Sequence, residues 1–455
     1  MSKAGIIAGK VFKVIAVIAV ILIFVSPVVL GVTIVYLASK PRDLNFTEKS
    51  FTEFDGEITS VDVRAYSRKV VLTGVDGDFS VDYYEFGGGS LTVSFSDGKL
   101  TVDERRLPPS CGGYPGAAES YENEKRFTVS ISVPKSLTGE SALSVFGGAE
   151  ISGIAFDGYV SVGARGENLS IKDTEFNASA KIDASGEDLN IENVKAARLG
   201  IFSHGDLNIK NAEVENAEIE TSLGGVTVEN LTAEELFKAD THSGDILLDG
   251  VFAEEIWVET VDGAQSLKNI EADNIDLFSE SGNISVENLS AADGSRAKEL
   301  KAQTRIGNIG LKDVSANEIS IGTTGGGQNL ENIDAESIGL ESYTGGQSLK
   351  NIEAQNVELQ TRSGDIECET VSAANFSAKT KQGNIKAEGL AVGDTEFFTV
   401  SGNITAEFTE VLGEYSIAVS YSTGSSNAAN QTGSTPKTIS ASTDAGHIKL
   451  YFKLA

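Results

Sequence analysis

Three kinds of side chain in this sequence could do chemistry: histidines, carboxylates, and the Asp or Asn residues that follow a glycine. His204, His242 and His447 each lie beside a glycine of a repeated phrase, and the first two are two repeats apart. We therefore interpret them as turn residues and not as ligands of one metal ion. Gly-Asp and Gly-Asn pairs also occur in calcium-binding repeats, but the nine-residue glycine-rich period of those repeats is not found. Turn formation is the favoured explanation.

The carboxylates do not form the cluster that a hydrolase needs. Sugar-cleaving β-helices gather acids and bases on one face of a few adjacent coils, whereas Asp and Glu are here spread along the chain and interleaved with Lys. No nucleophile elbow, phosphate-binding loop or paired-cysteine motif occurs. Two cysteines cannot make a disulfide framework, and Cys368 falls on an inward position. The sequence predicts a protein that is not an enzyme and that holds no metal and no cofactor.

The elements that carry these residues repeat every nineteen positions. A Ser/Thr row, and an apolar row four residues before it, recur with this spacing except for one step of 25, which marks a six-residue insertion at about 292–297. Apolar residues alternate within a unit, as in Ile366, Cys368, Val371 and Ala373, and a period of two indicates β-strands. We expect two strands of about five residues and two turns in each unit. So thin a unit must bury its apolar face against its neighbours, which predicts an all-β fold, a parallel β-solenoid or β-helix.

Two further rows support the stacking of the units. Residues that tolerate a left-handed corner follow the first strand: Asn230, Gly250, Asn269, Asn288, Asp313, Asn332, Asn351 and Gly389. The glycine that precedes Asp or Asn at the other end of the unit is interpreted in the same way. Outward charges alternate in sign through six units: Lys268, Glu287, Lys312, Glu331, Lys350 and Glu369. Parallel coils about 4.8 Å apart would place these charges side by side.

The chain is predicted to have four parts. Residues 14–38 are 25 residues without a charge, and we favour a transmembrane helix that is retained over a signal peptide that is cleaved. Residues 1–13 would be a short cytoplasmic N-terminus, residues 43–145 a β-rich N-terminal cap region, and residues 146–455 the solenoid with a C-terminal cap. About twelve or thirteen coils would form a rod on the order of 60 Å long. Caps are expected because an open sheet edge would polymerise.

Four stretches of the chain carry a family resemblance. They read "ITSVDVRAYSRKVVLTG", "GKLTVDERR", "RFTVSISVP" and, repeatedly, Ser-Gly-Asp/Asn-Ile. They resemble the putative adhesin family, β-strand-repeat domains of unknown function found in bacteria and archaea. The resemblance covers about residues 50–455 and implies the repeat fold, often behind a single membrane helix, but it implies no activity. The loop at residues 108–124 departs from the family pattern.

The net charge limits the kinds of partner that the protein is expected to bind. The chain has 66 acidic and 36 basic residues, a formal charge of −30, and residues 1–42 contain five bases and no acid. So acidic a body should repel nucleic acid and anionic lipid. We expect a membrane contact through the helix alone, an unidentified surface glycan or protein as ligand, and a monomeric ectodomain. The expected location is the cell membrane, with a single pass and the solenoid outside the cytoplasm.

Trp257 and Phe278 are the candidate contact residues. Both lie between inward neighbours and should point outward, one coil apart. Either the six-residue insertion folds over them or they form a contact patch. The leading hypothesis is a membrane-anchored cell-surface solenoid that acts as a non-catalytic, adhesin-like binding or scaffold module. The alternatives are an envelope-state sensor that signals through its helix and, third, a carbohydrate-active enzyme on the solenoid face.

Overall fold

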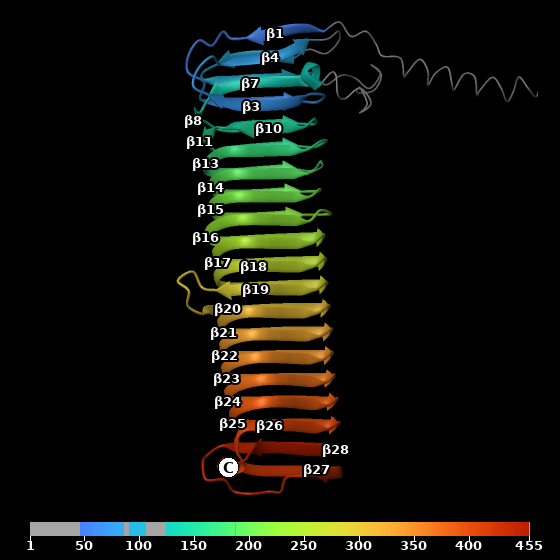
Figure 1. The fold of residues 1–455 in the computed structure, drawn as a ribbon. Helices are drawn as coiled ribbons and strands as arrows, with labels where there is room; N and C mark the ends of the chain where they lie inside the picture. Colours follow the sequence, from blue (N-terminus) through green and yellow to red (C-terminus); the bar gives the residue numbers. More distant parts are fainter. Residues whose placement is uncertain (1–45, 86–90, 106–123, 187, 455) are drawn as a thin grey trace, which may run out of the picture.

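The protein, seen in a computed structural model, is a rod of stacked parallel β-coils (Figure 1). The structure describes residues 46–85, 91–105, 124–186 and 188–454. The predicted membrane helix and the short segment before it lie outside these ranges. Within them, no helix is long and apolar enough to cross a bilayer. The predicted all-β parallel solenoid with coils of about 19 residues is confirmed, and it has about 16 turns.

A regular coil is one bent strand of 17 residues followed by a short turn. In β23 (Gln347–Ser363) buried and exposed residues alternate, but two neighbouring outward residues occur at Lys350-Asn351 and again at Gln355-Asn356. The chain turns at both places, so each coil has three inward-facing runs. The expectation of two strands and two turns is therefore corrected. Pairing with the neighbouring coils resumes after each corner, which keeps the strand continuous.

The repeated coils run from β12 to β26, and each pairs in parallel with its neighbours. The strands are β12 (Val160–Ala164), β13 (Leu169–Ala184), β14 (Leu189–Ser203), β15 (Leu207–Thr221), β16 (Val226–Ser243), β17 (Ile246–Asp262), β18 (Gln265–Ser281), β19 (Ile284–Ser290), β20 (Ala297–Ile306), β21 (Ile309–Gly325), β22 (Gln328–Thr344), β23, β24 (Ile366–Gln382), β25 (Ile385–Ser401) and β26 (Ile404–Val411). Inward side chains stack row on row. Ile338, for example, pairs with Ile319 in one neighbouring coil and Val357 in the other, as the sequence predicts.

The N-terminal strands continue the solenoid out of chain order. They are β1 (Thr47–Phe51), β2 (Ser60–Ala65), β3 (Lys69–Val75), β4 (Ser80–Glu85), β5 (Leu91–Ser96), β6 (Lys99–Glu104), β7 (Thr128–Pro134), β8 (Ser136–Leu137), β9 (Ser141–Val145), β10 (Ala149–Ser152) and β11 (Ala155–Phe156), with a 3-10 helix, η3, at Glu124–Phe127. Strands β2 and β3 lie in parallel between β6 and β7 on one side and β9 and β10 on the other. The ladder thus crosses the predicted boundary between residues 145 and 146. Antiparallel strands β1, β4 and β5 border this end.

The N-terminal end contains a buried ion pair. The Arg68 and Glu104 side chains are 0% and 3% exposed, and Arg68 Nε lies 3.1 Å from Glu104 Oε1. The Glu104 carboxylate also accepts the backbone N–H groups of Tyr66 at 2.7 Å and Ser67 at 2.9 Å. Removing one partner of such a pair costs about 3–5 kcal/mol, because the other charge stays buried. The pair therefore fixes the turn between β2 and β3 against the end of β6.

The C-terminal end is also assembled out of chain order. After a 3-10 helix, η4 (Leu412–Glu414), the chain forms β27 (Ser416–Ser426) and returns as β28 (Thr438–Lys453), which lies between β27 and the coil of β25 and β26. Thr443 and Ile448 pair with Thr399 and Ile404, so β28 repeats the unit once more, as predicted. Aromatic rings fill the interior here, with the Phe408 centroid 5.0 Å from that of Phe452 and 5.2 Å from that of Tyr415.

A column of glycines closes the coils. A Cβ on Gly364 would lie 2.0 Å from the carbonyl oxygen of Gly345, and one on Gly345 would lie 1.8 Å from that of Gly326. No other residue fits at such distances, so glycine is required by the close approach of consecutive backbones. Our interpretation of this row as left-handed corners is wrong for Gly345 and Gly364, whose φ angles lie outside that region.

The Asn row is left-handed as predicted. Asn332 and Asn351 have φ angles of 57° and 55°, and their side chains form a ladder in which Asn351 Nδ2 donates to Asn332 Oδ1 at 3.0 Å. Thr370 takes the same place in the next coil with φ of 58°, although nothing in its residue type predicts it. The left-handed corner is therefore imposed by stacking even where the side chain disfavours it.

The remaining residues of the repeated phrase bind one coil to the next. Thr380 Oγ1 donates to the Gly364 carbonyl at 3.0 Å, and Thr361 Oγ1 donates to the Gly345 carbonyl at 3.1 Å. The Asp365 carboxylate accepts the Asn384 backbone N–H at 2.6 Å. Thr361, Thr380 and Asp365 thus satisfy backbone groups that the turn takes out of the regular ladder, whereas the buried hydroxyl of Ser342 in the same row has no partner among the described residues.

Replacing a column glycine should destabilise the rod. We expect Gly364→Ala to lower the free energy of unfolding by about 1–3 kcal/mol or more, because the new methyl group must push two backbones apart. Gly310→Ala is the matched control, since a Cβ there has no heavy atom within 4 Å. Thermal unfolding followed by circular dichroism measures both changes. Equal midpoints for the two variants would show that close approach does not select these glycines.

Candidate functional site

Most residues that could do chemistry are engaged in stacking. His204, His242 and His447 are exposed, and the Nδ1 atom of His447 lies 2.9 Å from Ser425 Oγ. No group of three or more His, Cys, Asp or Glu side chains able to hold a metal ion occurs among the described residues. The Asp/Asn of the repeated phrase accepts backbone N–H groups along the turn, which accounts for its presence without calcium.

Cys368 is a core residue, as the sequence predicts. Its side chain is 4% exposed and faces inward between Leu349 and Ala387 in the adjacent coils. Burial raises the pKa of the Cys368 thiol to about 12. The thiol therefore stays protonated at neutral pH and is a poor nucleophile.

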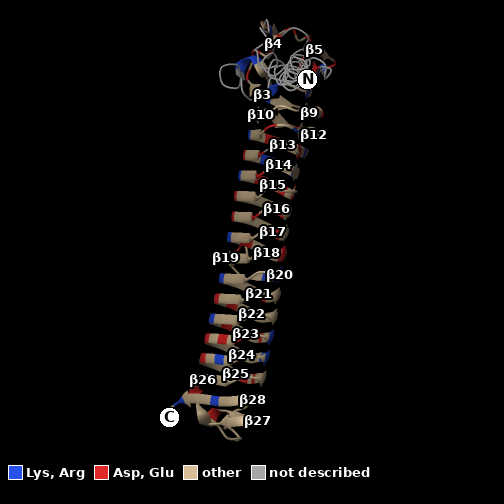
Figure 2. Ribbon diagram, turned by 90° about the vertical axis from the view of Figure 1, so that its right-hand side faces the viewer, with Lys and Arg blue, Asp and Glu red and all other residues tan. Residues whose placement is uncertain are grey.

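Outward charges are matched between coils over much of the rod (Figure 2). In the row predicted from the sequence, the Glu287 carboxylate lies 3.3 Å from Lys268 Nζ and 3.5 Å from Lys312 Nζ. The hydrogen bond and charge of Lys268, and then the charge of Lys312, lower the pKa of Glu287. The same row continues toward the N-terminal end, where Lys172 lies 2.9 Å from Glu192 and Lys210 lies 2.8 Å from Glu229.

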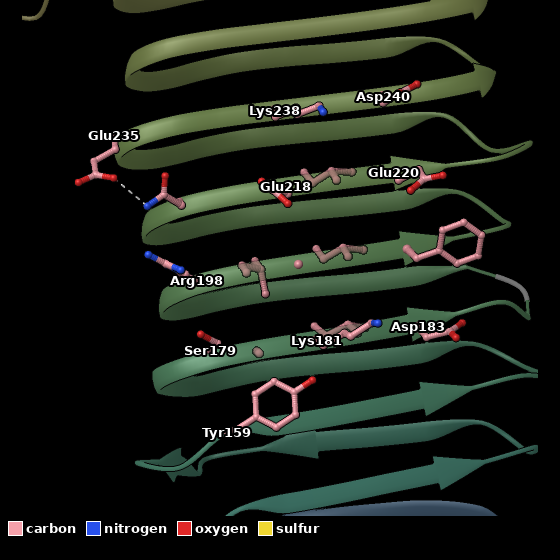
Figure 3. A pocket seen from close by; sticks show the side chains of 18 residues that line it. Tyr159, Ser179, Lys181, Asp183, Arg198, Glu218, Glu220, Glu235, Lys238 and Asp240 are labelled. Atoms are coloured by element: carbon pink, nitrogen blue, oxygen red, sulfur yellow. Dashed lines mark hydrogen bonds between the residues drawn. The ribbon is translucent and has the colours of Figure 1, made fainter.

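One face of the rod departs from this matching and is hollowed. A pocket of about 810 Å³ opens on the third run of the coils β13 to β16, with the Tyr159 ring at one end and Lys238 and Asp240 at the other (Figure 3). Gly200 lies at its centre, between Lys181 and Glu218 of the adjacent coils, and a Cβ there would meet only one atom, at 3.7 Å. Packing does not require this glycine, so its missing side chain deepens the pocket. The outward polar groups around it are Ser179, Lys181, Asp183, Arg198, Asn216, Glu218, Glu220, Glu235, Lys238 and Asp240.

Two cations of the pocket stand apart from carboxylates. Lys181 is flanked in the ladder by Ser161 and Gly200. Arg198 is likewise flanked by Ser179 and Asn216. Neither cation lies within ion-pair distance of an acid among the described residues. Both side chains are exposed, so their charges are available to a ligand.

The acids of the pocket have different surroundings. Asp183 Oδ1 is buried and accepts no hydrogen bond from the residues that the structure describes. The Glu235 carboxylate, in contrast, accepts a hydrogen bond from Asn216 Nδ2 at 3.0 Å. Glu218 and Glu220 are exposed on the neighbouring coil. A buried oxygen without a donor costs free energy, and the Asp183 side chain as a whole is partly exposed at the pocket.

With this geometry in place, the chain can be compared with known proteins. A family model described as Toastrack DUF4097 matches residues 58–249, 202–297 and 292–450. The chain belongs to the Toastrack DUF4097 family. The family resemblance inferred from the four stretches is thus confirmed.

A solved structure and a search of curated proteins complete the comparison of this Toastrack protein. A putative adhesin from Bacteroides fragilis NCTC 9343, known from a crystal structure, is similar at 15% sequence identity with a TM-score of 0.23. That match covers 65% of this chain and 98% of the other. The search of curated proteins found no significant match.

Trp257 and Phe278 lie on the same face of the Toastrack solenoid as the pocket, just beyond it. Trp257 follows Lys238 in the ladder, and Lys238 Nζ lies 4.0 Å from the centre of the Trp257 ring. Phe278, at 36% exposure, pairs with Glu259 in the coil of Trp257. The two aromatic residues therefore lie beyond the end of the pocket along the rod, and their role as a contact patch stays a prediction.

The insertion belongs to the coil that follows Phe278, so along the rod it lies on the side of the two aromatic residues away from the pocket. Seven residues separate Leu289 from Ala297, whereas one separates their partners Val314 and Ala316, so the extra residues are 291–296. This is one position earlier than predicted. The insertion projects from the side of the rod (Figure 1), and the Arg296 guanidinium pairs with the Asp334 carboxylate of β22, farther from Trp257 along the rod.

Tryptophan fluorescence can test this arrangement, because Trp257 is the single tryptophan of the Toastrack protein. We expect iodide to quench its emission in the wild type, since the indole is only partly buried. Deleting residues 291–296 should leave the quenching constant unchanged. A clear rise in quenching in the deletion variant would mean that the insertion covers Trp257.

Proposed function

We propose that this Toastrack protein is a non-catalytic, adhesin-like binding module that holds a carboxylate-bearing oligosaccharide in the pocket. The supporting observation is the pair of cations, Lys181 and Arg198, whose ladder neighbours are neutral although many outward cations elsewhere in the rod pair with acids. A fold selected for stability alone would gain from an acid beside each of them. Cations kept free in so acidic a protein point to an anionic group on the ligand.

The other groups of the pocket suit the rest of such a sugar. Arg198 can bind a carboxylate with two parallel hydrogen bonds, and Lys181 adds a second positive charge. A sugar hydroxyl can donate to the Asp183 carboxylate, which is partly exposed at the pocket. The Tyr159 ring, 42% exposed, offers an apolar surface for the C–H face of a pyranose. Glu218 and Glu220 also line the pocket, and their negative charges would repel a dense polyanion. An oligosaccharide with isolated carboxylates therefore fits better.

Binding of a defined oligosaccharide tests the proposal. We expect oligogalacturonate to bind the full-length protein, and Lys181→Ala to weaken the binding roughly tenfold or more by removing a charge-assisted hydrogen bond. Lys195→Ala is the matched control, because Lys195 pairs with Glu213 at 2.6 Å and does not line the pocket. The methyl-esterified oligosaccharide, which lacks the charge, should bind more weakly than the acid. Isothermal titration calorimetry gives the dissociation constants.

Two outcomes would decide against this function. Equal affinity for acid and ester, or equal loss in Lys181→Ala and Lys195→Ala, would show that the two free cations do not select the ligand. Cleavage of the oligosaccharide would favour the second candidate, a carbohydrate-active enzyme, for which the carboxylates gathered in the pocket are the supporting observation. In that case Glu218→Gln should abolish cleavage and retain binding.

We further propose that residues 14–38 hold the protein in the cell membrane with the solenoid outside the cytoplasm. The proposal rests on their 25 consecutive uncharged residues and on the basic segment that precedes them. A sensor that signals through this helix is the alternative.

Protease treatment of intact cells tests the topology. We expect the full-length protein to fractionate with membranes and an added protease to release most of its mass from intact cells, because the body would be accessible. Lysed cells treated in the same way provide the control for protease sensitivity. Protection in intact cells with digestion only after lysis would place the body in the cytoplasm and reverse the orientation.

A further inference from the structure

The C-terminal end of the rod exposes a strand edge. Among the described residues β27 pairs with β28 on one side, and on the other side it has a single bridge, from Ile417 to Gln431. The Ile417 N–H donates to the Gln431 carbonyl at 2.9 Å, and the Val419 N–H donates to Asn430 Oδ1 at 2.7 Å. The loop after β27 thus covers the first half of the strand, at the red end of the rod in Figure 1.

The second half of β27 keeps the bonding positions of an interior coil. In interior coils the turn glycine and the residue two positions later donate N–H groups to the next coil, as Gly364 does to Gln382 at 3.0 Å and Ile366 to Asn384 at 2.9 Å. Gly424 and Ser426 hold the corresponding places in β27, opposite Gly446 and Ile448 of β28. Within the described chain no coil follows β27, so these donors face away from the rod without the partner that every interior coil provides.

This edge lacks the features that usually block pairing. Residues 415–436 contain no Lys, Arg, Asp or Glu, although the chain as a whole carries a formal charge of −30. Exposed edges are commonly protected by charged side chains, proline or a covering segment. Tyr421, in the middle of β27, is 48% exposed. At the opposite end, in contrast, antiparallel strands border the rod and β1 presents exposed Glu48 and Lys49.

We propose that β27 is a self-association edge, at which two copies of this chain pair their C-terminal ends through antiparallel β27 strands. Charge selects this occupant: two bodies of like charge repel one another over their sides, but the uncharged strand lets them approach end to end. The bordering strands at the N-terminal end oppose head-to-tail stacking into filaments. In a symmetric pair each copy uses its own strand edge, so no edge is left for a third copy and the assembly stops at the dimer. This proposal replaces the monomer expected from the sequence and is independent of the pocket and its ligand.

The mass of the purified full-length protein in detergent, measured by light scattering over a range of concentrations, tests the proposal. We expect a reversible monomer–dimer equilibrium in the wild type. Ser426→Pro removes an outward N–H and should raise the dimer dissociation constant at least about tenfold. Ser426→Ala is the matched control, because it also loses the Ser426 hydroxyl contact with Ala428 but retains the N–H. It should dimerise like the wild type.

A second variant distinguishes a loss of dimerisation from local unfolding of the strand. Tyr421→Lys leaves the backbone groups in place and adds a positive charge from each copy beside an otherwise uncharged interface, so it should also give monomers with an unchanged thermal midpoint. A wild type that stays monomeric up to its solubility limit would overturn the proposal and leave the edge to a different partner. Dimers of equal stability in all four proteins would also overturn it, because association would then lie elsewhere, for example in residues 14–38.

Discussion

The spacing between stacked backbones is the constraint on which the rest of the structure depends. Strands in a ladder lie about 4.8 Å apart, so each coil must repeat the path of the one before it. At the turn this path brings a Cα so close to the preceding carbonyl that a methyl group on Gly364 would come within 2.0 Å of the Gly345 oxygen. The same spacing lets the hydroxyl of Thr380 and the carboxylate of Asp365 reach backbone groups of the adjacent coil. The recurrence of Thr, Gly and Asp at these positions therefore follows from the single spacing between stacked backbones.

Because stacking uses the inward and turn residues, function must reside in the outward ones. Those residues are also constrained, since a charge placed on one coil has a neighbour on the next, and matched rows such as Lys268–Glu287–Lys312 satisfy the constraint. The pocket is the place where the rows stop matching. Lys181 and Arg198 have neutral neighbours, Gly200 leaves a gap, and Asp183 keeps an oxygen without a donor. A binding site on a solenoid is thus recognised as a local departure from the pairing that stabilises the rest.

The two ends of the rod differ in how they cover the strand edge of the outermost coil. At the N-terminal end the chain inserts β2 and β3 between other strands, buries the Arg68–Glu104 ion pair and borders the edge with antiparallel strands. At the C-terminal end β28 is inserted beneath β27, and the following loop covers only the start of the outermost strand. Both insertions make the end coils contact segments that are distant in the chain, which resists fraying from the termini. The asymmetry leaves one end available for association.

The sequence by itself determined most features that depend on translation by one coil. The period, the inward position of Ile338 and Cys368, the left-handed Asn row and the alternating charges all follow from residue i lying beside residue i+19, and the structure bears them out. Buried Gln328 and Gln347 escaped notice because their polar side chains break the apolar pattern. Gln347 Nε2 donates to Gln328 Oε1 at 2.8 Å within the core, while Gln347 Oε1 has no partner among the described residues. The alternation of apolar residues carries no signal for such a pair, although its members lie nineteen residues apart.

Only the tertiary structure decided the features that depend on the angle of the chain within a coil or on contacts between distant segments. Two corners divide each coil into three runs, and this division places Arg198, Glu218 and Lys238 on one face together with Trp257. The continuity of β2 and β3 with the repeats, and the open edge of β27, likewise involve strands stacked out of chain order. A one-dimensional pattern records which residues repeat, but corner angles and the threading of the ends arise from backbone packing in three dimensions.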